Sequence, residues 1–282
     1  DGGSASSCGH SPMTVIAAAL VPGSPLPLLK PENLPWGRIA TACQRVGRAI
    51  AATRPDTLMI YSTQWMAVLD QLWQTRPHVS GLHVDENWHE YGEMRFDMRI
   101  DTELAYGCVA ESARIGVQSK AVNYDAFPID SGTIAADAFL NPDGKFALLL
   151  ASNNLYHDWD TTWKLGALAA RVADQQNRKV AVIGVGGLSG AMFREPVEIR
   201  DDRISRDSDD KANRRLLDLI ERADVAGIRA FLPEYNETAS PDMGMKHLAW
   251  ILGALDGRFF GARTHGYGPT YGAGAAAVEF RL

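Results

Sequence analysis

Long apolar runs are missing from this sequence of 282 residues. A helix that spans a bilayer needs about 18 or more consecutive apolar residues, and no run approaches that length. Residues 1–12 are rich in Gly and Ser and lack the apolar core of a signal peptide. We expect these residues to be a disordered leader or a remnant of expression, followed by a single domain over residues 13–282.

Cysteine is scarce as well. Cys8, Cys43 and Cys108 form an odd count, and their spacing is not that of a metal site. Disulfide frameworks are typical of secreted proteins, whereas reduced cysteines are typical of the cytosol. We therefore expect a cytoplasmic protein whose thiols are buried and inert.

A clustered basic stripe is also missing. The net charge is −6, the isoelectric point is about 5.7, and the lysines and arginines are scattered along the chain. Surfaces that bind nucleic acids usually concentrate their basic residues on one face or one helix. The composition therefore excludes nucleic acid as an expected partner.

The sequence does contain apolar segments that end at turn residues. Residues 15–21, 57–61, 145–151 and 179–185 are typical of buried strands, and helical spacing predicts helices over 36–53 and 161–176. A strand–helix–strand unit implies a parallel pair of strands. The sequence thus predicts an α/β fold, a single domain with a mostly parallel central sheet flanked by helices on both faces. Further expected elements are helices over 101–113, at the end of 201–221 and over 243–255, strands over 96–100 and 275–280, an irregular aromatic segment over 67–93 and a Gly-rich tail over 261–274.

The loops after the four main strands indicate where a site would lie. In an open α/β sheet, ligands bind beyond the carboxyl ends of the strands. We therefore expect a site among Ser24, Gln64, Asn153 and Ser189. None of these side chains is a histidine, a cysteine or a carboxylate, the usual groups of acid–base and nucleophilic catalysis.

The glycines of residues 184–190 follow a strand, as the glycines of a dinucleotide-binding loop do. Such a loop requires a helix directly behind it, so that the helix N-terminus faces the pyrophosphate. Residues 193–196 (Phe-Arg-Glu-Pro) interrupt that pattern. We favour a tight turn with a close backbone approach over a nucleotide site.

One segment combines histidines with carboxylates. His83 and His89 lie near Asp85, Glu86 and Glu90, and imidazole with carboxylate suits a transition metal. A hydrated loop or a subunit contact is the favoured interpretation, because these residues lie in one flexible stretch.

Three other histidines have less specific surroundings. His157 follows a strand and could act as a general base, although nothing near it in the sequence would activate it. We expect His247 to be packed in a helix or an interface, and His265 to bond to backbone groups.

Six short motifs together carry a resemblance to a known family. They are residues 21–27, 60–65, 83–88, 123–125, 184–190 and 266–280. On these motifs the chain, over residues 13–282, resembles the class III extradiol ring-cleaving dioxygenases of the protocatechuate 4,5-dioxygenase superfamily. Catalytic members of that family hold Fe(II) with two histidines and one glutamate, which leaves open positions for substrate and O2.

This chain departs from the family at those positions. Gly23 and Gln64 stand where the two histidines would be, and Asp242 stands on or near the glutamate position. Gly190 replaces the family's acid–base histidine. Because glycine has no donor atom and a neutral amide is a poor ligand for Fe(II), the resemblance implies no metal and no catalytic residue here, only four vestigial positions.

The resemblance then implies a non-catalytic α subunit of a heteromeric dioxygenase. A homologous β subunit would hold Fe(II) in an α2β2 assembly and would insert O2 beside the amino-bearing carbon of an aminophenol, giving an aminomuconic semialdehyde. Trp73, Trp88 and Tyr91 are expected contacts with that subunit, unless they pack a long loop. The residues expected to line a remaining substrate pocket are Ser24, Tyr124, Asn153, His157 and Ser189.

Two alternatives stay open. The chain could be a metal-dependent dioxygenase whose site has moved to His83, His89 and the neighbouring acids, or to His157. It could instead be a binding module whose vestigial pocket takes an aromatic ligand as a regulator.

Overall fold

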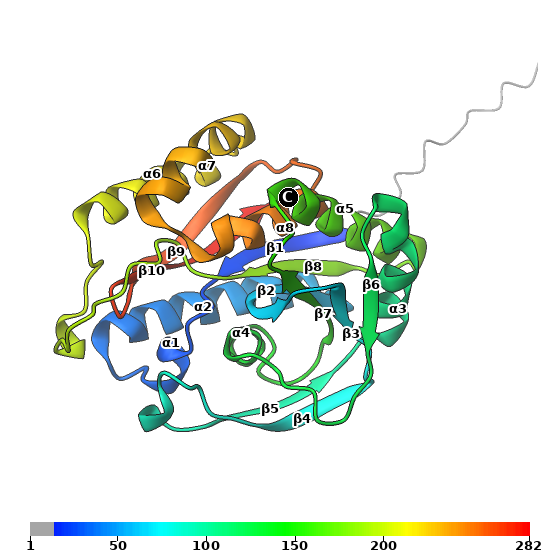
Figure 1. Ribbon diagram of the computed structural model, residues 1–282, viewed down its shortest axis with the longest axis horizontal. Coiled ribbons are helices and arrows are strands. Elements are labelled where there is room, and N and C mark those ends of the chain that lie inside the picture. The colour runs from blue at the N-terminus through cyan, green and yellow to red at the C-terminus, as the bar shows by residue number, and fades with distance from the viewer. Residues whose placement is uncertain (1–13) are drawn as a thin grey trace, which may run out of the picture.

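An eight-stranded sheet forms the centre of the computed structural model, which describes residues 14–282 (Figure 1). Its strands are β1 (Val15–Val21), β2 (Thr57–Ala67), β3 (Gln71–Gln74), β6 (Ser119–Val122), β7 (Ala147–Asn154), β8 (Val180–Val185), β9 (Gly261–Thr270) and β10 (Ala273–Arg281). They lie in the order β6-β3-β7-β2-β8-β1-β10-β9. The central strands β7, β2, β8 and β1 are parallel, whereas β9 and β10 form an antiparallel hairpin beside β1. The expected leader, residues 1–12, lies outside the described residues.

Helices cover both faces of this sheet (Figure 1). One face carries α3 (Thr102–Glu111), α5 (Trp159–Gln175), α6 (Asp207–Glu221), α7 (Val225–Ala239) and α8 (Lys246–Ala254), and the other carries α1 (Leu26–Leu29), α2 (Leu34–Thr53) and α4 (Ser131–Leu140). A second, two-stranded sheet of β4 (His78–His83) and β5 (Met94–Arg99) lies outside α4. The predicted α/β architecture is confirmed. Within residues 14–282, no helix has both the length and the apolarity that crossing a bilayer requires.

Two apolar cores, one on each face, hold the layers together. Along β2, Leu58 and Ile60 join the core beneath α2 and α4, whereas Met59 and Tyr61 join the core on the opposite face. This alternation follows from the two-residue period of a strand. Because such strands are buried on both faces, they read as continuous apolar runs, which is why the sequence predicts them well.

The predicted elements differ from the structure in several places. Strand β2 runs beyond its predicted end at residue 61 and reaches Ala67. Its residues 62–65 bulge away from β7, and the pairing with β7 resumes at Met66. The segment 67–93, predicted to be irregular, contains β3 and β4. The Gly-rich tail contains β9, whose backbone pairs with β10. Helix α7 was not predicted, and it carries an interior proline, Pro233.

Of the three aromatic residues expected at a subunit contact, one belongs to the core. Trp73 is fully buried, with its ring centroid 6.2 Å from that of Trp250, so its predicted role was wrong. Trp88 and Tyr91 stack with centroids 6.1 Å apart and planes within 4°. They are partly exposed and also pack against Tyr271 and Trp36. Their contact with a partner subunit stays a prediction.

Two of the three cysteines lie within the described residues. Cys43 and Cys108 are free and buried, as expected. Burial raises the pKa of the Cys43 thiol to about 12, so it stays protonated at neutral pH. Cys8 lies outside the described residues.

The crossing of α5 and α8 depends on two glycines. A Cβ on Gly166 would collide with the carbonyl oxygen of Trp250, and a Cβ on Gly253 would collide with that of Trp163. We predict that Gly166→Ala lowers the free energy of unfolding by about 1–3 kcal/mol, because the helices must separate. Urea denaturation measures this change.

Gly268→Ala is the matched control for that substitution. A Cβ at Gly268 would meet only the Ile39 side chain, at 3.7 Å. We expect its stability to change by less than about 0.5 kcal/mol. Equal losses in the two variants would contradict the role assigned to the helix crossing.

Candidate functional site

Two adjoining pockets open at the carboxyl edge of the central strands. Their volumes are about 560 and 570 Å³, and both are lined by Gln64, Asp85 and Asp242. Ser24 and Ser189 also line the larger one. The structure therefore brings together three of the four loop residues at which the sequence analysis places a site: Ser24, Gln64 and Ser189.

Gln64 sits on the bulge of β2 and ties three elements together. Its Nε2 donates to the carbonyl oxygen of Gly23, after β1, over 2.7 Å. Its Oε1 accepts from the N–H of Gly132, in the first turn of α4, over 2.8 Å. Both ends of the amide are thereby engaged with backbone groups. A Cβ on Gly23 would lie 3.2 Å from Nε2, so Gln64 fills the space beside this glycine.

Asp242 precedes α8 and faces both pockets. Its Oδ2 accepts from the N–H of Gly187 over 2.7 Å. Burial raises the pKa of this carboxyl, although the hydrogen bonds from Gly187 and the Thr63 hydroxyl oppose the shift. The predicted helix over 243–255 begins later, at Lys246, because residues 243–245 have left-handed φ values of 44°, 63° and 64°.

Gly190 lines the larger pocket without room for a side chain. Its N–H donates to the carbonyl of Ala239 over 2.9 Å. A Cβ at this position would collide with the carbonyl oxygen of Ser240. The backbone is therefore packed too closely for a histidine to occupy residue 190.

The loop after β8 is a tight turn, as favoured from the sequence. The N–H groups of residues 186–190 all donate to acceptors of the protein, among them the carbonyls of Val21 and Gly274. The amides that would bind a phosphate are thus already paired, so the structure does not support a nucleotide site. His247 of α8 packs against Gly186 and is fully buried, and burial lowers its pKa to about 3.

The other residues predicted to line a pocket are not brought to these two pockets. Asn153 is buried, accepts from the Tyr61 hydroxyl and donates to the carbonyl of Thr63. Tyr124 is 70% exposed. Burial and the neighbouring Lys246 lower the pKa of His157, whose own carbonyl accepts from that lysine.

His265 has a different partner from the one predicted. Its Nε2 lies 2.6 Å from Oε2 of Glu279 across the β9–β10 hairpin. The sequence suggested backbone partners because the register of this hairpin was not visible.

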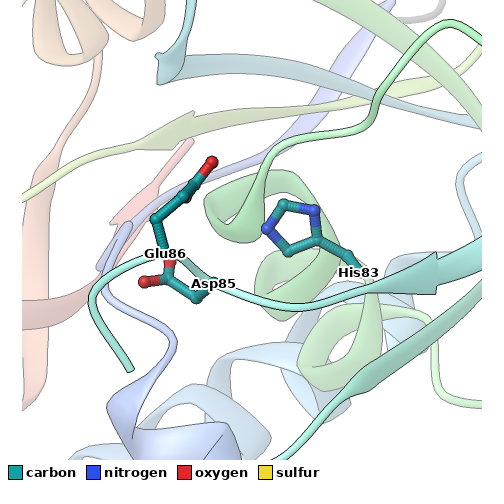
Figure 2. Close-up of side chains that lie close together, drawn as sticks. All are labelled: His83, Asp85 and Glu86. Atoms are coloured by element: carbon teal, nitrogen blue, oxygen red, sulfur yellow. The ribbon is translucent and has the colours of Figure 1, made fainter. Parts of the chain in front are cut away.

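A cluster of His83, Asp85 and Glu86 lines the smaller pocket. Their possible ligand atoms all lie within 4.8 Å of one another, and Figure 2 shows the three side chains gathered where β4 ends. The Ser131 hydroxyl donates to Asp85 over 2.6 Å and lies 2.9 Å from Nε2 of His83. Ser131 is 46 residues from Asp85 in the chain, so sequence reasoning missed this connection.

His89 does not belong to this cluster. It is exposed and lies near Glu90, with 3.8 Å between Nδ1 and the carboxylate. The relocated metal site suggested by the sequence is therefore not assembled around both histidines.

The vestigial positions do not fit an Fe(II) ion. Gly23 offers no side-chain donor, and the donor and acceptor of Gln64 are both engaged with backbone groups. Asp242 is left as one carboxylate, itself bonded to an N–H. A facial triad needs three ligands on one face of the metal, and these residues supply at most one.

Comparisons with a family model and with known proteins point to the same family. A family model described as the catalytic LigB subunit of aromatic ring-opening dioxygenase matches residues 9–280. The chain is 44% identical over 271 residues to the 2-aminophenol 1,6-dioxygenase alpha subunit of a Pseudomonas species, covering 96% of this chain and 100% of that protein. It is 24% identical over 268 residues to a 2-aminophenol 1,6-dioxygenase beta subunit from Pseudomonas, covering 89% and 88%.

More distant relatives share the architecture. The chain is 22% identical over 219 residues to the 3,4-dihydroxyphenylacetate 2,3-dioxygenase of Escherichia coli, covering 77% of this chain and 79% of that enzyme. A crystal structure of an uncharacterized protein from Escherichia coli K12 superposes with a TM-score of 0.66 at 13% identity, covering 93% and 98% of the two chains. This structural likeness supports the fold alone.

Gln64→Glu tests the bridge between Gly23 and Gly132. The substitution replaces a donor by an oxygen that faces the Gly23 carbonyl, so we expect a loss of about 1–3 kcal/mol in unfolding free energy. Gln44→Glu, on the exposed side of α2, should change stability by less than about 0.5 kcal/mol. Urea titrations compare the two, and an unaffected Gln64→Glu protein would refute the bridge.

Asp242→Asn tests the burial of the carboxyl. Because the folded pKa of Asp242 is raised, the folded protein holds its proton more tightly than the unfolded chain, and stability falls as the pH rises above the ordinary carboxyl value. Asparagine cannot ionise and still accepts from Gly187. We predict that the stability of the variant relative to the original protein, measured by denaturation, increases as the pH rises above the ordinary carboxyl pKa of about 4. A difference that is constant with pH would contradict this.

Proposed function

Because the chain belongs to the LigB family of aromatic ring-opening dioxygenases, we propose that it is a non-catalytic α subunit of a heteromeric extradiol dioxygenase acting on 2-aminophenol or a substituted relative. A homologous β subunit holds the Fe(II) and inserts O2 into the ring. The two subunits form an α2β2 assembly.

The observation that carries this proposal is the bonding of Gln64. A histidine ligand presents a free ring nitrogen to a metal, whereas the Gln64 amide is bonded at both ends to Gly23 and Gly132. The packing at Gly190 adds support, because a proton-transferring side chain has no space there. Transfer of the substrate proton to a positioned group is the role that the acid–base histidine has in this family.

The relatives support a paired subunit. The match to an α subunit spans that protein completely at 44% identity, and the match to a β subunit spans 88% of its length at 24%. Two homologous subunits under one enzyme name are consistent with one active and one supporting copy. The alternative of a catalytic chain built on His83 and His89 has less support, because these two histidines do not converge.

Iron analysis and turnover test the proposal. The full chain, purified alone, should cleave no 2-aminophenol even after incubation with Fe(II) under anaerobic conditions followed by O2. Combined with a β subunit, it should give an active complex whose iron content follows the number of β chains. Ring cleavage by the single chain with stoichiometric iron would refute the proposal.

Asp242→Asn provides the matched control within the complex. It removes the one remaining carboxylate of the vestigial set. We predict that a complex containing this variant keeps its iron and keeps its turnover per iron within about twofold, since a twofold change is only about 0.4 kcal/mol of barrier. A fall of a hundredfold or more in a folded complex would place Asp242 in the reaction.

A further inference from the structure

We propose that His83, Asp85 and Glu86 form a binding site for a divalent transition metal, distinct from the position of the family's ring-cleaving iron. The proposal concerns the cation and makes no claim that this chain cleaves rings. It does not depend on the function proposed above.

The first support is the convergence of three donors. One nitrogen or oxygen from each residue lies within 4.8 Å of the others, and Figure 2 shows the three side chains close together at the end of β4. His83 ends that strand, and Asp85 is held by the N–H groups of Asn87 and Trp88 at 2.9 and 3.2 Å. Two of the three ligands are therefore positioned before any metal arrives.

The second support is the hydroxyl that joins two of the donors. Ser131 donates its one hydroxyl proton to Oδ2 of Asp85, so Nε2 of His83 donates to the Ser131 oxygen. Both atoms therefore face this one hydroxyl and lie on the same side of the pocket. A carboxylate has about four acceptor directions, and the bonds just described use three of the Asp85 directions. One remains for a metal. Because Nε2 of His83 donates to Ser131, it carries the ring proton in the metal-free chain. Binding a metal through Nε2 would move that proton to Nδ1 and would replace the contact with Ser131.

The third support is the charge of the pocket. Its lining includes four carboxylates, and no lysine or arginine is among the residues of the described chain that line it. The carboxylates belong to Asp85, Glu86, Asp130 and Asp242. A bound divalent cation would offset this unbalanced negative charge and would be the largest charge in the site.

The ligand set indicates the class of metal. One imidazole with two carboxylates suits Zn²⁺ and neighbouring first-row ions, whereas Ca²⁺ and Mg²⁺ favour sites made of oxygen alone. Three protein ligands leave a fourth position open to water. The three donors are different residues from Gln64 and Asp242, although both sets line the same pocket.

Calorimetric titration of Zn²⁺ into the full, chelator-treated chain tests the proposal. We expect one ion per chain, and we expect His83→Ala and Glu86→Gln each to weaken binding by at least about tenfold. Glu86 is exposed, so its variant reports on binding even if His83→Ala disturbs the fold. The same titration with Ca²⁺ should show binding at least about tenfold weaker than that of Zn²⁺.

His89→Ala is the matched control, because His89 lies in the same segment but outside the cluster. It should bind Zn²⁺ as the original chain does. The proposal is overturned if the original chain binds no stoichiometric Zn²⁺, if His83→Ala binds it unchanged, if His89→Ala loses it, or if Ca²⁺ binds equally well.

Discussion

Where the parallel strands end, backbone N–H and C=O groups have no partner strand and need other hydrogen-bond partners. The structure of this edge of the sheet depends on those hydrogen bonds. At this edge the carbonyl of Gly23 and the N–H of Gly132 come from segments far apart in the chain, and the Gln64 side chain pairs with both. An unpaired buried backbone group costs about 1–3 kcal/mol, so this one amide stabilises the junction of β1, β2 and α4. A histidine that binds a metal could not supply the same donor and acceptor together.

Close packing also fixes the loop after β8 at this edge of the sheet. Gly190 lies against Ser240, and Asp242, two residues further on, accepts from Gly187 of the same loop. The left-handed backbone of residues 243–245 follows directly and turns the chain into α8. Such conformations cost on the order of 1–3 kcal/mol each and persist only where the surroundings hold them. The loop after β8 and the start of α8 are thus fixed to each other.

The elements that can be predicted from the sequence are those whose residues follow a local, periodic apolar pattern. The central strands and α2 are visible because burial on two faces, or on one helical stripe, leaves a periodic signature. Strand β9 is not visible, because its glycines carry no side-chain pattern and its place depends on pairing with β10. Trp73 shows a second limit, since an aromatic residue can anchor an interface or a core with equal ease, and only tertiary packing decides. At the site, the sequence identifies Gln64 and Gly190 as substitutions in a family pattern but does not reveal their new partners.

The N-terminus of α4 connects the two sets of residues at the pocket. Gly132 donates to Gln64, and the preceding residue, Ser131, bonds to Asp85 and contacts His83. Asp130 caps the same helix through the N–H of Thr133 and accepts from Ser62 of the β2 bulge. Three successive residues therefore fix the bulge and the end of β4 from one rigid helix turn. Because the helix cannot shift for one set without moving the other, the Gln64 bridge and the side chains gathered at His83 belong to one packed unit.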